Sequence, residues 1–241
     1  MWKYWNNFSQ SRQCTTIAFV SNTQYNYCVM ETNRVKYQNF KKAFMPMGCF
    51  TGDQVRLWKD DFGRDNFTRW IASGDILRLR RNLYTFPDYL QQPDSALFFS
   101  GKIYAPSYLS LHTALHFHGL IPEEVMQFTA VSTKKTAYFE NVFGQYTYRH
   151  ISPQYMYGFE LLKSESNPNF TMLMATPEKA LLDLLHLYPQ YKTEIDMIEL
   201  RLDQTQMTER FSTQTFRKHL ERIGSPELSR RADRLMEVYC D

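Results

Sequence analysis

The sequence predicts an α+β fold, in which helical and strand patterns occupy successive segments of the chain. Three observations support this prediction. Three short helical patterns precede two short strands between residues 35 and 90, strand patterns dominate residues 128–175, and helical patterns fill most of residues 191–241. Helices and strands grouped in this way are typical of α+β proteins, whereas regular alternation is typical of α/β proteins.

Composition limits the possible functions. The 241 residues carry 28 basic and 25 acidic side chains, and the apolar fraction of 43% is enough to bury a core. Apolar runs are short, so we expect neither a membrane segment nor a secretory signal, and the chain has no glycine-rich phosphate loop. The four cysteines are scattered without metal-binding spacing, which favours a reducing, cytoplasmic location.

Charge is distributed unevenly along the chain. Residues 1–90 hold 13 basic and 7 acidic residues, whereas residues 91–241 hold 15 basic and 18 acidic residues. A basic N-terminal part suggests a polyanionic partner for that part, although an imbalance of this size also arises by chance.

The first 34 residues differ from the rest of the chain. Residues 1–29 contain seven Asn and Gln residues, no acidic residue and no persistent helical or strand period. We therefore expect residues 1–34 to be a disordered or non-native extension, and we hypothesise that Met30 is the natural initiator.

Three helices are predicted at the start of the folded part. An amphipathic pattern over residues 35–44 ends near Pro46, and Thr51 is a capping residue for a second short helix. A third helix is predicted over residues 63–73, with Gly74 as its C-terminal stop. These helices are short, so they need tertiary packing to be stable.

Two short strands follow the third helix. They are predicted at residues 76–79 and 83–86, with Arg80, Arg81 and Asn82 joining them and Pro87 ending the unit. Three helices and then a hairpin is the order of a winged helix-turn-helix domain, which we predict over residues 35–90.

The third predicted helix has two different faces. Phe67, Trp70 and Ile71 fall on one side and should pack on the first two helices. The other side carries groups that hydrogen-bond base edges and phosphates, and arginines occupy the hairpin. The residues on this side are Asp65, Asn66, Thr68, Arg69 and Ser73, with Arg64 at its margin, and the hairpin arginines are Arg78, Arg80 and Arg81.

A different use of this domain remains open. Winged helices also bind proteins, and a charged helix face is often only solvated. Asp60, Asp61 and Asp65 near the start of the third helix would repel phosphate, although acidic residues there also suit the helix dipole.

Residues 95–241 are predicted to form a mixed α+β domain with C-terminal helices. Pro106 and Ser107 precede a predicted helix, and Thr176 caps a later one that carries Lys179 and Asp183 as a surface pair. Five helices are predicted: residues 108–120, residues 177–188, a helix through Ile195, Ile198 and Leu202, a helix through Phe216, Leu220 and Ile223, and residues 228–239. Four strands are predicted at residues 128–132, 146–151, 156–162 and 172–175. The basic run Arg230, Arg231 and Arg234 is interpreted as a solvated face.

Patterns that could support catalysis or metal binding are weak. His112 and His116 are one helical turn apart, but no HExxH motif is present. A metal-dependent nuclease remains an alternative function, with Glu140 and Glu160 as its candidate carboxylates, although Glu160 and Lys163 lack the required Glu-x-Lys spacing. We therefore expect no catalytic residue, no metal and no cofactor.

Several strings together resemble one family. "GDILRLRRNLYTFPDY" (74–89) is similar to the wing of the AbiEi family, the antitoxin half of an abortive-infection type IV toxin–antitoxin pair. "IYAPSYLSLHTALHFHGLIPE" (103–123), "TAVSTKKTAYFENVFGQYTYRHI" (129–151) and "ATPEKALLDLLHLYP" (175–189) resemble successive blocks of its second domain. The order and spacing of the blocks carry the resemblance over about residues 35–190.

The resemblance implies a cytoplasmic bacterial antitoxin with a winged-helix domain followed by an antitoxin domain. Such a protein represses its own operon by binding inverted repeats in double-stranded DNA. The resemblance places the DNA-contacting positions at Arg64, Asn66, Thr68, Arg69, Arg78, Arg80 and Arg81. It counters a nucleotidyltransferase-like toxin without forming a stable complex. One departure is visible, since Asn82 replaces a glycine that the family usually carries in the wing; Asn tolerates a left-handed backbone, so we expect the turn to persist.

Overall fold

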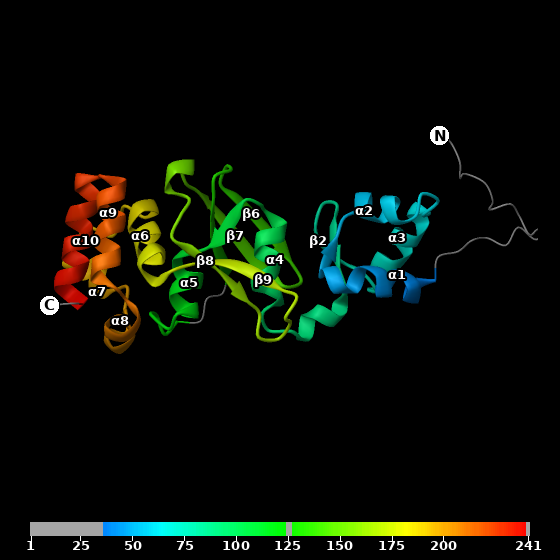
Figure 1. Ribbon diagram of the computed structural model, residues 1–241, viewed down its shortest axis with the longest axis horizontal. Helices are drawn as coiled ribbons and strands as arrows, with labels where there is room; N and C mark the ends of the chain where they lie inside the picture. Colours follow the sequence, from blue (N-terminus) through cyan, green and yellow to red (C-terminus); the bar gives the residue numbers. More distant parts are fainter. Residues whose placement is uncertain (1–35, 124–126, 240–241) are drawn as a thin grey trace, which may run out of the picture. The chain divides into compact units, whose positions relative to one another are not determined.

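The computed structural model describes residues 36–123 and 127–239, and Figure 1 shows its helices and strands. The predicted extension over residues 1–34 and the proposed start at Met30 lie outside the described residues. The described residues, 36–123 and 127–239, belong to one compact unit. Its described part contains ten α-helices and two β-sheets, which confirms the predicted α+β class.

A three-stranded sheet and three helices form the first part of this unit. The predicted helices and strands lie close to their expected bounds. One further strand, β1, was not predicted, because two residues are too few to show an alternating pattern; β1 pairs with β3, and the sheet order is β1-β3-β2. The elements are α1 (Tyr37–Phe44), β1 (Cys49–Phe50), α2 (Gly52–Trp58), α3 (Arg64–Ala72), β2 (Leu77–Arg80) and β3 (Leu83–Thr85).

Aromatic side chains fill the space between these elements. Phe40 of α1 is fully buried, and its ring centroid lies 5.1 Å from that of Phe50 and 4.9 Å from that of Trp70. As expected, Thr51 caps α2; it accepts a hydrogen bond from the Gln54 backbone N–H in a capping box. Burial of these aromatic rings therefore stabilises this small part of the fold.

A six-stranded mixed sheet follows in the chain (Figure 1). Its strand order is β6-β7-β5-β4-β9-β8, with the pairs β4–β9 and β5–β7 parallel and the other pairs antiparallel. The elements are α4 (Ser95–Ile103), β4 (Ser107–Leu109), α5 (Leu111–Phe117), β5 (Gln127–Ser132), β6 (Ala137–Asn141), β7 (Gly144–His150), β8 (Phe159–Lys163), β9 (Thr171–Ala175) and α6 (Pro177–Leu187).

The predicted helix over residues 108–120 is wrong in its first part. Tyr108 and Leu109 belong to β4, and the helix α5 begins only at Leu111, with Ser110 as its N-cap residue. β4 lies between β5 and β9, so its backbone groups are paired on both sides. This long-range pairing outweighs the local helical spacing of the leucines.

The two faces of the large sheet pack against different partners. Ala130 packs in a core that also contains Phe98 and Phe99 of α4, whereas its neighbour Val131 packs in a core that contains Leu115 of α5. Successive residues of a strand point to opposite faces, so α4 and α5 cover opposite faces of the sheet. The α4 core also includes the aromatic residues of α1 and β1.

Four further helices complete the described chain and pack with α5 and α6 in one core. The prediction of one helix through Ile195, Ile198 and Leu202 is wrong, since α7 ends at Ile198 and both isoleucines are mainly exposed. Arg231 is buried rather than solvated, and its Nη1 donates to the Leu185 carbonyl oxygen at 2.7 Å. The helices are α7 (Glu194–Ile198), α8 (Gln204–Arg210), α9 (Thr213–Ile223) and α10 (Pro226–Tyr239).

Candidate nucleic-acid interface

Helix α3 separates an apolar face from a polar one. Trp70 is 3% exposed, and the Phe67 ring lies 5.2 Å from the Phe62 ring, which holds this side of α3 against the aromatic core. Thr68 and Arg69 are exposed on the other side. The predicted division of α3 into two faces is therefore confirmed for these residues.

Two of the predicted contact residues on α3 interact with each other. Arg69 Nη2 donates to the Asn66 side-chain oxygen at 2.8 Å, as the i, i+3 spacing on a helix allows. A guanidinium has five N–H donors, so this bond orients Arg69 while leaving donors for another acceptor. Arg64 is the first residue of α3, and its side chain lies outside what the structure describes.

The hairpin places one arginine beside α3. Arg78 of β2 is exposed and lies directly opposite Tyr84 of β3, so the two side chains share one face of the sheet. The Tyr84 ring lies 5.1 Å from the ring of Phe67 in α3. The face that carries Arg78 is therefore the face that packs on α3.

A bulge separates Arg80 from Arg78. Simple alternation would put both side chains on one face, but the register shifts between them and pairs Arg80 with Leu83. Leu83 is next to Tyr84 in the strand and faces the opposite way. Arg80 is therefore on the face away from α3, and β2 contacts the large sheet at this end, since the Asn141 side-chain amide of β6 donates to the Leu79 carbonyl oxygen at 3.1 Å.

The tip of the hairpin is held against α2. Asn82 has φ +59°, the left-handed conformation expected for this turn. Its side-chain oxygen accepts from the Gly52 N–H at 3.0 Å, and its amide nitrogen donates to Asp53 at 3.0 Å. Arg81 precedes Asn82 at this tip and is exposed.

These arginines remain available for an external anion. Among the residues that the structure describes, Arg69, Arg78, Arg80 and Arg81 form no ion pair with a carboxylate. Acidic residues lie near the start of α3, as the sequence indicates. Asp61 lies 3.5 Å from the Lys59 ammonium, which reduces its repulsion of a phosphate, whereas the exposed Asp65 is in the first turn of α3.

The nuclease residues considered from the sequence do not come together. Glu140 lies on β6 and Glu160 on β8, which are the two outer strands of the six-stranded sheet, so the two carboxylates occupy opposite edges. His118 Nε2 is 2.8 Å from the Ala175 carbonyl oxygen. In the described ranges, no group of three His, Cys, Asp or Glu residues could hold a metal ion.

A buried polar cluster lies between β4 and α6, where the sequence indicated a surface pair. Lys179 and Asp183 form an ion pair and are 0% and 1% exposed. Asp183 also accepts hydrogen bonds from the Tyr108 and Ser110 hydroxyls, both at 2.8 Å. Burial raises the pKa of Tyr108, and the neighbouring Asp183 raises it further.

The surface assignment of Lys179 and Asp183 is therefore wrong. The helix α6 is buried along most of its length, because the sheet and other helices of the unit cover it. The i, i+4 spacing was the correct signal for the pair, but it carries no information about burial. This pair is closed to solvent, and Asp183 also accepts hydrogen bonds from Tyr108 and Ser110, so the cluster connects α6 to β4 and offers no access to a substrate.

Comparison of the chain with models of known protein families and with curated proteins found no match. Among the described residues, no helix is long and apolar enough to cross a bilayer. The assignment of function therefore depends on the chemistry of α3 and the hairpin.

Proposed function

We propose that this protein binds double-stranded DNA and regulates transcription through a winged helix-turn-helix domain over residues 35–90. The order of elements, three helices with a three-stranded sheet whose last two strands form a hairpin, supports this proposal. The main observation is that Arg69 of α3 and Arg78 of β2 are both exposed and, among the described residues, neither forms an ion pair with a carboxylate.

In the proposed complex, α3 enters the major groove. Arg69, oriented by Asn66, suits the N7 and O6 acceptors of guanine, and Thr68 is exposed on the same helix. Arg78 and Arg81 contact phosphates and set the position of the domain on the duplex. Arg64, the first residue of α3, is a further proposed DNA contact.

We further propose that the regulator is an antitoxin located in the cytoplasm. This part of the proposal rests on the resemblance of the sequence to the AbiEi family. The DNA partner would be inverted repeats in the chain's own operon, and the functional partner a nucleotidyltransferase-like toxin that forms no stable complex with it. No catalytic residue, metal or cofactor is part of this function.

Salt dependence of DNA binding tests the proposal. The fluorescence anisotropy of a labelled duplex from the region upstream of the gene should report binding by the full chain at low salt. Because phosphate contacts release counterions, log K should fall linearly with log salt, and affinity should drop by at least about tenfold between about 50 and 200 mM salt.

An exposed arginine far along the chain provides the control. Arg210 ends α8, is exposed and belongs to no predicted contact set, so Arg210→Ala should bind as the unchanged chain does. The absence of any duplex binding at low salt would contradict the DNA-binding proposal. That result would instead favour the protein-binding use of the domain, to which the exposed Asp60 and Asp65 are better suited.

A further inference from the structure

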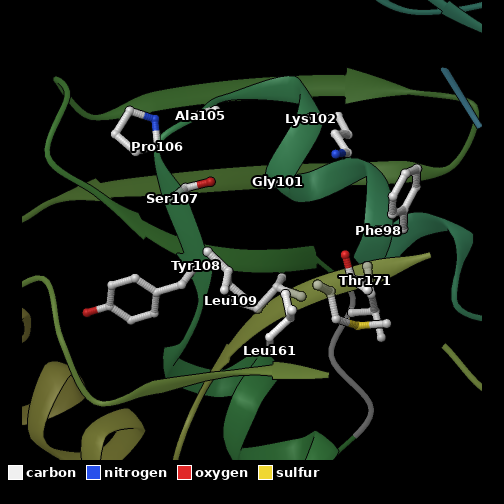
Figure 2. A pocket seen from close by; sticks show the side chains of 13 residues that line it. Phe98, Gly101, Lys102, Ala105, Pro106, Ser107, Tyr108, Leu109, Leu161 and Thr171 are labelled. Carbon is white, nitrogen blue, oxygen red and sulfur yellow. The ribbon is translucent and has the colours of Figure 1, made fainter. Parts of the chain in front are cut away.

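A cavity of about 290 Å³ lies between α4 and the strands β4, β8 and β9 (Figure 2). Its walls are mainly apolar. They include Leu97 and Phe98 of α4, Leu109 of β4, Leu161 of β8, and Met172 and Leu173 of β9. The volume is at the lower end of the range for ligand sites, so an occupant must be small.

Ser107 of β4 brings an unpartnered hydroxyl to this cavity. The side chain is 5% exposed, and its oxygen has no hydrogen-bond partner in the described part of the chain. Figure 2 shows this oxygen directed toward α4, whereas Tyr108 points the other way, toward its partner Asp183. A buried hydroxyl without a partner is unfavourable, so a bound acceptor would stabilise this site.

Lys102 supplies a positive charge beside the same space. It lies in the last turn of α4, and its ammonium is 5.1 Å from the centre of the Phe98 ring. In Figure 2, its nitrogen and the Thr171 oxygen point toward the space between α4 and β9. Among the described residues, Lys102 forms no ion pair.

The chemistry of the walls selects the class of ligand. Every polar side chain that lines the cavity is a lysine or an alcohol, apart from the Tyr108 phenol, and the lining contains no carboxylate. A cation would find no countercharge here, and a purely apolar molecule would leave Ser107 unpaired. An anionic head with an apolar body satisfies both parts of the site.

We propose that this cavity binds a small monocarboxylate with an apolar chain. The carboxylate accepts hydrogen bonds from Lys102 Nζ and Ser107 Oγ, and the chain lies against Leu109, Leu161 and Met172. This inference concerns a site on the large sheet and does not depend on the proposed DNA binding.

Calorimetric titration of the full chain with hexanoate and octanoate tests the proposal. We expect saturable binding of both acids, and at least tenfold weaker binding of hexylammonium and of hexanol, because charge-assisted hydrogen bonds to the carboxylate are lost. Binding of hexylammonium equal to that of hexanoate would overturn the proposal. Absence of saturable binding of both acids at millimolar concentration would also overturn it.

Three variants locate the site. Lys102→Met keeps an apolar stem but removes the charge, and should weaken hexanoate binding by about tenfold. Gly101→Leu adds a bulky side chain at a residue that lines the cavity and should weaken hexanoate binding by at least tenfold; its Cβ meets no atom within 4 Å, so the helix can accept the change. Lys218→Met on the exposed part of α9 is the matched control and should bind hexanoate normally.

Circular dichroism separates a folding defect from a binding defect. The spectra of the three variants should match that of the unchanged chain. If Lys102→Met and Gly101→Leu are folded and still bind hexanoate with unchanged affinity, the acid binds elsewhere and the assignment of this cavity is wrong.

Discussion

Arg69 shows how a single residue can be exposed and still oriented. Its hydrogen bond to Asn66 restricts a side chain that would otherwise lose considerable rotamer entropy on binding. A base-reading residue benefits from this restriction, because a bidentate contact to guanine requires both position and direction. Arg69 is therefore the residue from which we expect sequence discrimination.

Replacement of Arg69 should reduce discrimination more than affinity for random DNA. Arg69→Ala should decrease the free-energy difference between operator and random duplex by about 1–3 kcal/mol. Competition anisotropy with the two duplexes measures this difference. A loss of equal size for both duplexes would show that Arg69 contacts phosphate and reads no base.

For Asn82, the sequence predicts the backbone conformation but not the hydrogen bonds of the side chain. Its left-handed backbone conformation could be predicted, because asparagine tolerates positive φ better than most residues. Its bonds to Gly52 and Asp53 could not, since they join positions about thirty residues apart whose proximity depends on the β1–β3 pairing. These bonds shorten the free part of the hairpin.

At the scale of elements, the sequence predicted best where local signals are sufficient. Thr51 and Thr176 were correctly identified as caps, because capping needs only residues three positions apart. The strand β4 was misassigned because its stability comes from β5 and β9, which lie far along the chain. The burial of Lys179 likewise depends on neighbours that its own helix does not specify.

The bulge in β2 leads to a prediction that sequence alternation alone would not give. Arg78 shares the face of the sheet that packs on α3, whereas the register shift turns Arg80 to the opposite face. Arg78→Ala should weaken binding to all duplexes and reduce the slope of log K against log salt by about one, as expected for one lost phosphate contact.

Arg80→Ala should change this slope much less than Arg78→Ala does. Anisotropy titrations of both variants at several salt concentrations provide the comparison. If both variants lose the same slope, the two arginines contact DNA together, and the face assignment from the strand register is wrong.

At the scale of the whole molecule, three half-buried histidines connect stability to pH. His112, His186 and His219 lie on α5, α6 and α9, three helices of one core. Burial lowers the pKa of each of them below the ordinary value of 6.5. The folded chain therefore binds fewer protons than the unfolded chain just below pH 6.5.

The free energy of unfolding should consequently fall as the pH decreases from 6.5 toward the lowered histidine pKa values of the folded chain. Well above pH 6.5 the imidazoles are neutral in both the folded and the unfolded state, so these histidines cause no pH dependence there. Urea unfolding at pH 7.5 and pH 5.5 should give a lower midpoint at the acidic pH. In His112→Gln this difference in midpoint should be smaller, whatever the absolute stability of the variant.

His116 is exposed on the same helix, so His116→Gln is the control and should keep the full difference in midpoint between the two pH values. An unchanged difference in His112→Gln would show that other groups control the acid sensitivity of this core.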